Sequence, residues 1–94
     1  MSTIHDIAAS LTHRDKELIR EIALGFGNIL IGEHMHHETS TISSYRKDLF
    51  PIINCTNAVQ VAMFARETKI ITREDGIAFW DIIERTKIRN EFHR

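Results

Sequence analysis

The clearest pattern in the chain is an apolar stripe that recurs every three or four positions between residues 13 and 36. Leu18, Ile22, Phe26 and Ile29 follow this spacing, with Ile19 and Ala23 beside them. Such a repeat places apolar side chains on one face of an α-helix, whereas a strand would alternate strictly. We therefore predict a long helix over residues 13–36.

Three Thr-x-x-Asp sequences mark further helix starts, at Thr3, Thr12 and Thr72. The threonine hydroxyl can accept a hydrogen bond from a free backbone N–H of the first turn, and the aspartate can return one and meet the positive end of the helix dipole. The sequence thus predicts a short helix over about residues 4–10 and a last helix over about residues 73–90.

A run of hydroxyl side chains over residues 38–44 is the clearest polar segment. Short hydroxyl side chains compete for backbone partners, so we interpret the run as a linker. Pro51 is tolerated best in the first turn of a helix, which predicts a short turn at 44–49 and a main helix from Pro51 to about residue 68. This helix is apolar on most sides and should be largely buried.

Together these elements predict an all-α fold, in which residues 1–94 form a single helical domain. We expect a small bundle of about four helices, with two long helices antiparallel across the Ser/Thr-rich linker, because short connections make consecutive helices neighbours. The predicted core contains Leu18, Ile22, Phe26, Ile29, Ile53, Val59, Met63, Phe79 and Ile83.

Composition limits the function further. The chain is 43% hydrophobic and 27% charged, as ordered globular proteins are, and its net charge of −1 provides no excess for nucleic acid or membranes. With Cys55 as the one cysteine there can be no internal disulfide, which favours a cytoplasmic location. No apolar run approaches the roughly 20 residues of a membrane span, so we expect no membrane partner.

A cluster of imidazole and carboxylate groups ends the predicted helix 13–36. On a continuous helix these groups would lie one turn apart, at the spacing that a transition metal needs. The metal-ligand candidates are Glu33, His34, His36, His37 and Glu38. We favour no cofactor, because histidines at a helix C-terminus are stabilised by its dipole. A third interpretation is a pH-dependent interface.

Two glycines of the same helix suggest close approach by another helix, although a kink near Gly25 explains them equally well. Gly25 and Gly32 are seven residues apart and share the face of Ile29. The helix after Pro51 adds apolar surface that a small domain has difficulty covering. We predict a homodimer whose interface contains Gly25, Ile29, Gly32, Val61, Phe64 and Ala65.

Basic residues gather near the C-terminus, at Arg85, Lys87, Arg89 and Arg94. Such a group could contact phosphates of a nucleic acid, but it is also typical of a solvated helix end. The chain has no phosphate-binding loop, no nucleophile elbow and no paired cysteines, so we expect no enzymatic activity.

The favoured function is therefore a small protein-interaction module: an adaptor, regulator or inhibitor of another macromolecule. It would act as a homo-oligomer and bind an unidentified protein partner. Two alternatives stay open, namely a nucleic-acid-binding regulator that uses the basic C-terminal end and a metal-binding protein that uses residues 33–38.

Overall fold

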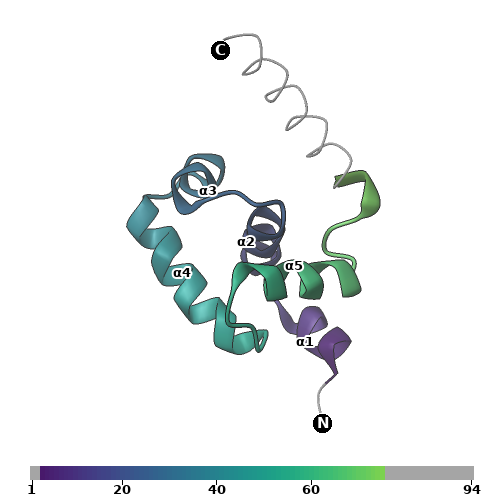
Figure 1. Cartoon of the computed structure of the whole chain (residues 1–94). Coiled ribbons are helices and arrows are strands. Elements are labelled where there is room, and N and C mark those ends of the chain that lie inside the picture. The colour runs from purple at the N-terminus through teal and green to yellow at the C-terminus, as the bar shows by residue number, and fades with distance from the viewer. Residues whose placement is uncertain (1–2, 76–94) are drawn as a thin grey trace.

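The computed structural model describes residues 3–75, which fold into five helices (Figure 1). These helices are α1 (Ile4–Ser10), α2 (His13–Ala23), α3 (Asn28–Met35), α4 (Thr39–Ile52) and α5 (Ala58–Glu67). Residues 3–75 contain no strand, so the predicted all-α class is confirmed. The two long helices of the prediction are instead four shorter ones that cross one another.

Both N-terminal helices begin where their capping sequences predict. Thr12 Oγ1 accepts a hydrogen bond from the Asp15 N–H at 3.1 Å, and the Asp15 carboxylate accepts one from the Thr12 N–H at 3.1 Å. Thr3 and Asp6 form the same reciprocal pair before α1. Each box satisfies two N–H groups that have no partner within the helix.

A comparable pair forms near the end of the described segment, where Thr72 and Asp75 exchange hydrogen bonds. The rest of the predicted helix 73–90 lies outside the described residues. The same holds for the predicted core residues Phe79 and Ile83.

The single helix predicted over residues 13–36 is wrong, because the chain turns at Gly25. Gly25 has φ 91°, a conformation that costs a glycine little. Its N–H donates to the Ile22 carbonyl at 3.0 Å and the Phe26 N–H donates to the Glu21 carbonyl at 3.2 Å, which closes α2 in a Schellman motif. The chain then starts α3 in a new direction, and Ile29 is 67% exposed instead of buried.

The predicted linker over residues 38–44 is also wrong, since α4 begins inside it. Ile42 and Leu49 are seven residues apart, share one face of α4 and are both buried, which explains why a segment rich in hydroxyl groups is held as a helix. Pro51 lies in the last turn of α4 and not at the start of a helix. The next helix begins only at Ala58.

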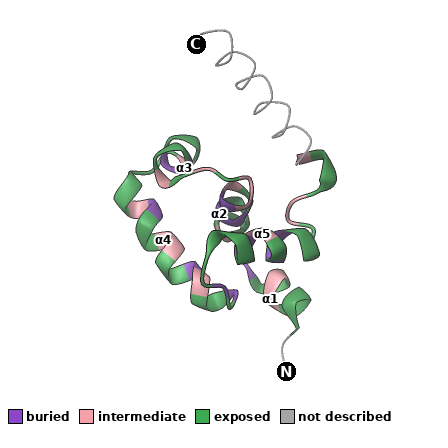
Figure 2. Ribbon diagram, in the orientation of Figure 1, coloured by how far each residue is buried: buried purple, intermediate pink, exposed green. Residues whose placement is uncertain are grey.

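The core forms where α2 packs against α5 and α3 packs against α4 (Figure 2). Its most deeply buried large side chains are Leu18, Ile19, Ile31, Ile42, Leu49 and Val61. Burial confirms three predicted core residues, Leu18, Ile22 and Ile53, while Phe26 packs against the core partly buried. Val59 and Met63 are 70% and 63% exposed. Both were predicted to be buried, but a different face of α5 packs against the core.

Four helices, α2 to α5, are each followed by a residue with a left-handed backbone: Gly25, His36, Asn54 and Lys69. Glycine and asparagine adopt this conformation readily and are common after helices. A residue with a larger side chain carries a steric cost of about 1–2 kcal/mol. His36 and Lys69 therefore occupy positions that backbone sterics alone would give to glycine.

Cys55 follows α4 as a small buried apolar residue. It is 8% exposed, and its thiol donates a weak hydrogen bond to the Ile53 carbonyl at 3.5 Å. Burial raises the pKa of the Cys55 thiol, which disfavours the reactive thiolate. Within residues 3–75, no helix has the length and apolar character needed to cross a membrane.

Candidate nucleic-acid interface

Helices α3 and α4 are joined by a tight turn of three residues, 36–38. His36 takes the left-handed conformation, and the His37 N–H donates to the Gly32 carbonyl at 2.8 Å. A Cβ atom on Gly32 would lie 2.6 Å from the His37 carbonyl oxygen, closer than packed atoms approach. Gly32 therefore permits the backbone contact that sets the direction of α4 relative to α3.

Side chains on both helices fix the same arrangement. Ile31 of α3 and Ile42 of α4 are fully buried and belong to one core cluster. At the start of α3, the Asn28 side-chain amide donates to Ser43 Oγ at 3.0 Å. The two helices thus form one unit. Its inner face packs against the rest of the protein, since α2 also contacts α3.

The outer face of α4 is polar and open to solvent (Figure 2). Ser40, Ser43, Ser44 and Lys47 are exposed and lie three or four residues apart, so they share one side of the helix. Serine side chains are short and carry both a donor and acceptors. This face can therefore approach a polar surface closely and form hydrogen bonds with it.

Aromatic side chains of α4 contact three basic residues, Arg14, His37 and Arg46. The Arg14 guanidinium lies 4.2 Å from the centre of the Tyr45 ring, and the His37 ring meets Tyr45 edge-on at 5.4 Å between centroids. Arg46 lies over Phe50 at 5.6 Å, and partial burial lowers the pKa of Arg46, which remains charged. Arg14 and Arg46 thus add positive charge next to α4.

Two helices that pack across a three-residue turn, with the second helix exposing a polar face, define a helix-turn-helix protein. A comparison with known families matches residues 9–65, more than half of the chain, to GerE, the luxR family of bacterial regulatory proteins. The chain belongs to this family. Comparisons with curated proteins and with solved structures gave no significant match.

Family membership corrects the favoured function. The luxR family domain is that of a DNA-binding transcription regulator, so the prediction of a protein-interaction module is wrong and the nucleic-acid alternative is supported. The domain is regulatory and not catalytic, which confirms the prediction that the protein is no enzyme. The basic residues Arg85, Lys87, Arg89 and Arg94, which the alternative invoked, lie outside the described residues.

The structure does not assemble the predicted metal-ligand cluster. α3 ends at Met35, so the one-turn spacing assumed for Glu33, His34, His36, His37 and Glu38 is lost at the turn. His34 is bonded to Glu21 of α2, and His37 packs on Tyr45. Among residues 3–75, no three histidine, cysteine or acidic side chains meet in a group that could hold a metal ion.

The six residues of the predicted dimer interface likewise do not form one exposed surface. Val61 and Ala65 are fully buried and Phe64 is 6% exposed, all within a single chain, so these three cannot provide a surface for a second copy. Gly32 is buried beneath the turn, and Gly25 ends α2. Of the six residues, Ile29 alone presents a large apolar side chain to solvent.

The helix α4 was not predicted from the sequence, which indicated a linker over 38–44 and only a short turn at 44–49. The signal was present, because Ile42, Tyr45 and Leu49 recur at helical spacing through the hydroxyl-rich run. It was obscured because α4 begins after Glu38 without any side-chain cap. Short hydroxyl residues that look like a linker are here the exposed face of the helix.

Proposed function

We propose that this protein is a DNA-binding transcription regulator whose α4 lies in the major groove of double-stranded DNA. The observation that carries the proposal is the exposed face of α4, with Ser40, Ser43, Ser44 and Lys47 presented beyond a buried inner face. In helix-turn-helix proteins the second helix enters the major groove, and serine hydroxyls can bond to any base edge. Family membership supports the same assignment.

Phosphate contacts in this proposal come from side chains next to α4. Lys47 shares the face of the exposed serines, and Arg14 lies over Tyr45 of the same helix; both would bond to backbone oxygens. The chain carries no overall positive charge, so few phosphates are neutralised and the affinity should depend only moderately on salt. A bacterial regulator of this kind would act in the cytoplasm, where the DNA is.

The proposal is tested by placing a single negative charge on the groove-facing side of α4. Binding sites are first selected with the wild-type chain from a random double-stranded library, and affinity is then measured by fluorescence anisotropy. Ser44→Glu should weaken binding about tenfold or more, equivalent to at least ~1.4 kcal/mol, because a carboxylate repels phosphates and base acceptors. The Ser44 side chain makes no hydrogen bond within residues 3–75 that the change would break.

Ser10→Glu is the matched control, because Ser10 is an exposed serine on α1. It should bind DNA within twofold of the wild type. Circular dichroism must show that both variants are folded. Wild-type affinity in folded Ser44→Glu would show that α4 is not the helix that contacts DNA.

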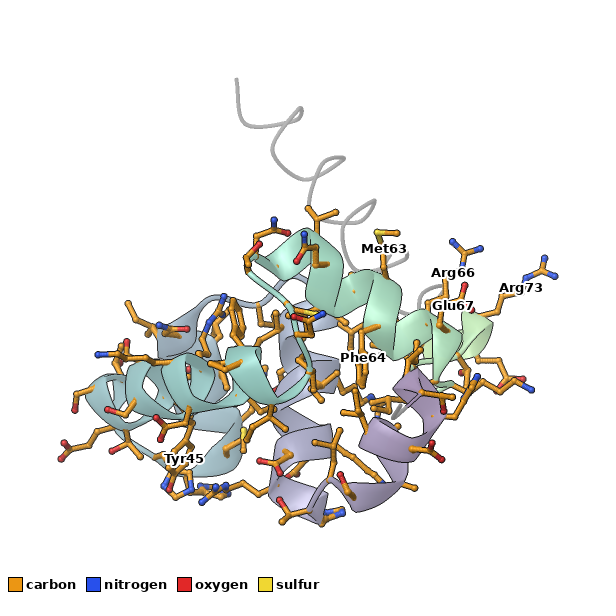
Figure 3. The ribbon with its side chains drawn as sticks, turned by 90° about the horizontal axis from the view of Figure 1, so that it is seen from below. Tyr45, Met63, Phe64, Arg66, Glu67 and Arg73 are labelled. Carbon is orange, nitrogen blue, oxygen red and sulfur yellow. The ribbon has the colours of Figure 1, made fainter. Side chains whose placement is uncertain are left out.

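We further propose that the protein binds DNA as a homodimer through the outer face of α5. Val59 and Met63 are strongly exposed there, and Figure 3 shows Met63 on the opposite side of α5 from the inward-pointing Phe64. Arg66 and Glu67 are exposed beside them, and neither has an ion pair within residues 3–75. A twofold pair of antiparallel α5 helices would bury the Met63 side chains of both copies against each other.

Dimerisation is tested by sedimentation equilibrium with and without DNA that carries two half-sites. The wild type should bind such DNA as two chains, and Met63→Glu should abolish the two-chain complex because it places like charges in an apolar contact. The matched control is Ile29→Glu, the exposed apolar residue of α3, which should leave the dimer intact. Loss of the dimer in Ile29→Glu alone would place the interface on α3.

A further inference from the structure

An open cleft of about 370 Å³ lies on a part of the molecule to which α4 contributes no residue. It forms between α1, the first turns of α2 and the segment that follows α5, and its lining residues are His5, Ala8, Ala9, Lys16, Thr68, Lys69 and Ile70. The volume falls within the range of small-molecule sites in proteins. Most of the lining residues lie outside residues 9–65, the part of the chain that matches the family.

The charged groups of this cleft are all of one sign. Lys16 and Lys69 are cationic, and His5 becomes cationic when protonated. No carboxylate lines the cleft, and neither lysine has an ion pair within residues 3–75. The Thr68 hydroxyl already donates to the Phe64 carbonyl at 2.7 Å. Ammonium groups that share a cleft repel each other, and an anion between them would remove that repulsion.

The backbone of Lys69 provides a second, independent observation. Its φ is 61°, in the left-handed region, and its N–H donates to the Arg66 carbonyl at 3.2 Å to end α5. Glycine would satisfy the same hydrogen bond without steric cost. A strained residue retained at the rim of a cleft points to a role for its side chain.

We propose that the cleft binds a small organic anion with a carboxylate or phosphate group. The anionic group lies between Lys16 and Lys69, and a short apolar portion lies against Ala8, Ala9 and Ile70. Charge-assisted hydrogen bonds from two lysines are the usual means of holding either group. A regulator would thereby acquire a site for a metabolite in addition to its DNA-binding surface.

The experiment titrates the full chain, labelled with ¹⁵N, with inorganic phosphate and separately with butyrate at constant ionic strength. Amide shifts should concentrate on α1, Lys16 and the segment around Lys69, and the ligand that shifts them more identifies the preferred anionic group. Lys16→Gln and Lys69→Gly should each weaken binding at least fivefold. Lys69→Gly should also raise the thermal midpoint, because it relieves the left-handed strain, so lost binding cannot be ascribed to unfolding.

Lys47→Gln on α4 is the matched control and should bind both anions as the wild type does, while it weakens DNA binding. The proposal is overturned if Lys69→Gly binds phosphate and butyrate unchanged, or if shifts spread evenly over the surface. A second outcome also overturns it: Lys16→Gln and Lys69→Gly bind both anions as the wild type does, but lose DNA affinity as Lys47→Gln does. The two lysines would then contact the DNA backbone.

Discussion

The pair α2–α5 and the pair α3–α4 are held together by different means. Between α2 and α5 the contact consists of large apolar side chains, including Leu18, Val61 and Phe64. Between α3 and α4 a backbone contact at Gly32 and a strained residue at His36 set the geometry. Both pairs bury large apolar side chains, among them Ile31 and Ile42 of the second pair, and in that pair the backbone contact at Gly32 also sets the direction of α4.

The largest effect should come from breaking the first pair with Phe64→Ala. Phe64 is 6% exposed in the α2–α5 contact, and its truncation should reduce the free energy of unfolding by about 3–5 kcal/mol. Urea denaturation followed by circular dichroism measures this. The neighbouring Met63→Ala is the control, because Met63 is 63% exposed and should change stability by at most about 0.5 kcal/mol. Equal losses in the two variants would refute the assignment of the inner face.

Gly32→Ala should have the next largest effect, through the second pair. The new Cβ would clash with the His37 carbonyl oxygen, so the turn must move, at a cost of about 1–3 kcal/mol. Because the turn sets the direction of α4, DNA affinity should fall by more than the loss of stability explains. Gly27→Ser is the control: a Cβ there has open space, and its hydroxyl can cap α3, so stability should stay or rise by up to about 1 kcal/mol.

A smaller change of opposite sign is expected for His36→Gly. Glycine relieves the left-handed strain but loses more entropy on folding, so the net gain should be about 0.5–1 kcal/mol. Gly25→Ala, which introduces strain at φ 91°, should instead lower the urea midpoint. If His36→Gly destabilises the protein, contacts of the imidazole must outweigh the strain.

The smallest effect concerns Asp75, whose carboxylate links the end of the described segment to α2. Hydrogen bonds from the Thr72 backbone, and then from its hydroxyl and from Arg20, lower the pKa of Asp75. A carboxyl whose pKa is lowered by folding contributes stability above its unfolded pKa, and this contribution disappears as the pH falls below about 4. Asp75→Asn should therefore lower the urea midpoint at pH 7, and this effect should shrink progressively as the pH falls below about 4.

The helix starts that could be predicted from sequence are those marked by a Thr-x-x-Asp capping box. The side-chain cap of α5, at Asn57, was not recognised, and that helix was predicted to begin at Pro51. Thr3 and Thr12 each started a helix at the predicted residue, whereas α3 and α4 follow Gly27 and Glu38, which make no capping hydrogen bond. Without a start signal, α3 merged with α2 into one predicted helix and α4 was taken for a linker. The error in α4 hid the candidate site, since its candidate residues are mostly serines.

Exposure on α5 could not be predicted from sequence for a related reason. A helix thought to begin at Pro51 has a different inward face from one that begins at Ala58, so Val59 and Met63 were placed inside and Phe64 outside. An error in the predicted start of a helix therefore reverses which of its residues are predicted to be buried and which exposed. Because that helix is apolar on most of its sides, its pattern alone could not determine which side faces the core.

Because Cys55 is buried, the rate of its chemical modification can be used to measure local opening of the protein. As the one cysteine in the chain, it can react with a thiol reagent at a single position, and its 8% exposure blocks that reaction in the folded state. The rate of modification under native conditions therefore reports how often the segment between α4 and α5 opens. Binding of DNA to α4 should slow that rate, which would allow occupancy to be followed without any label on the DNA.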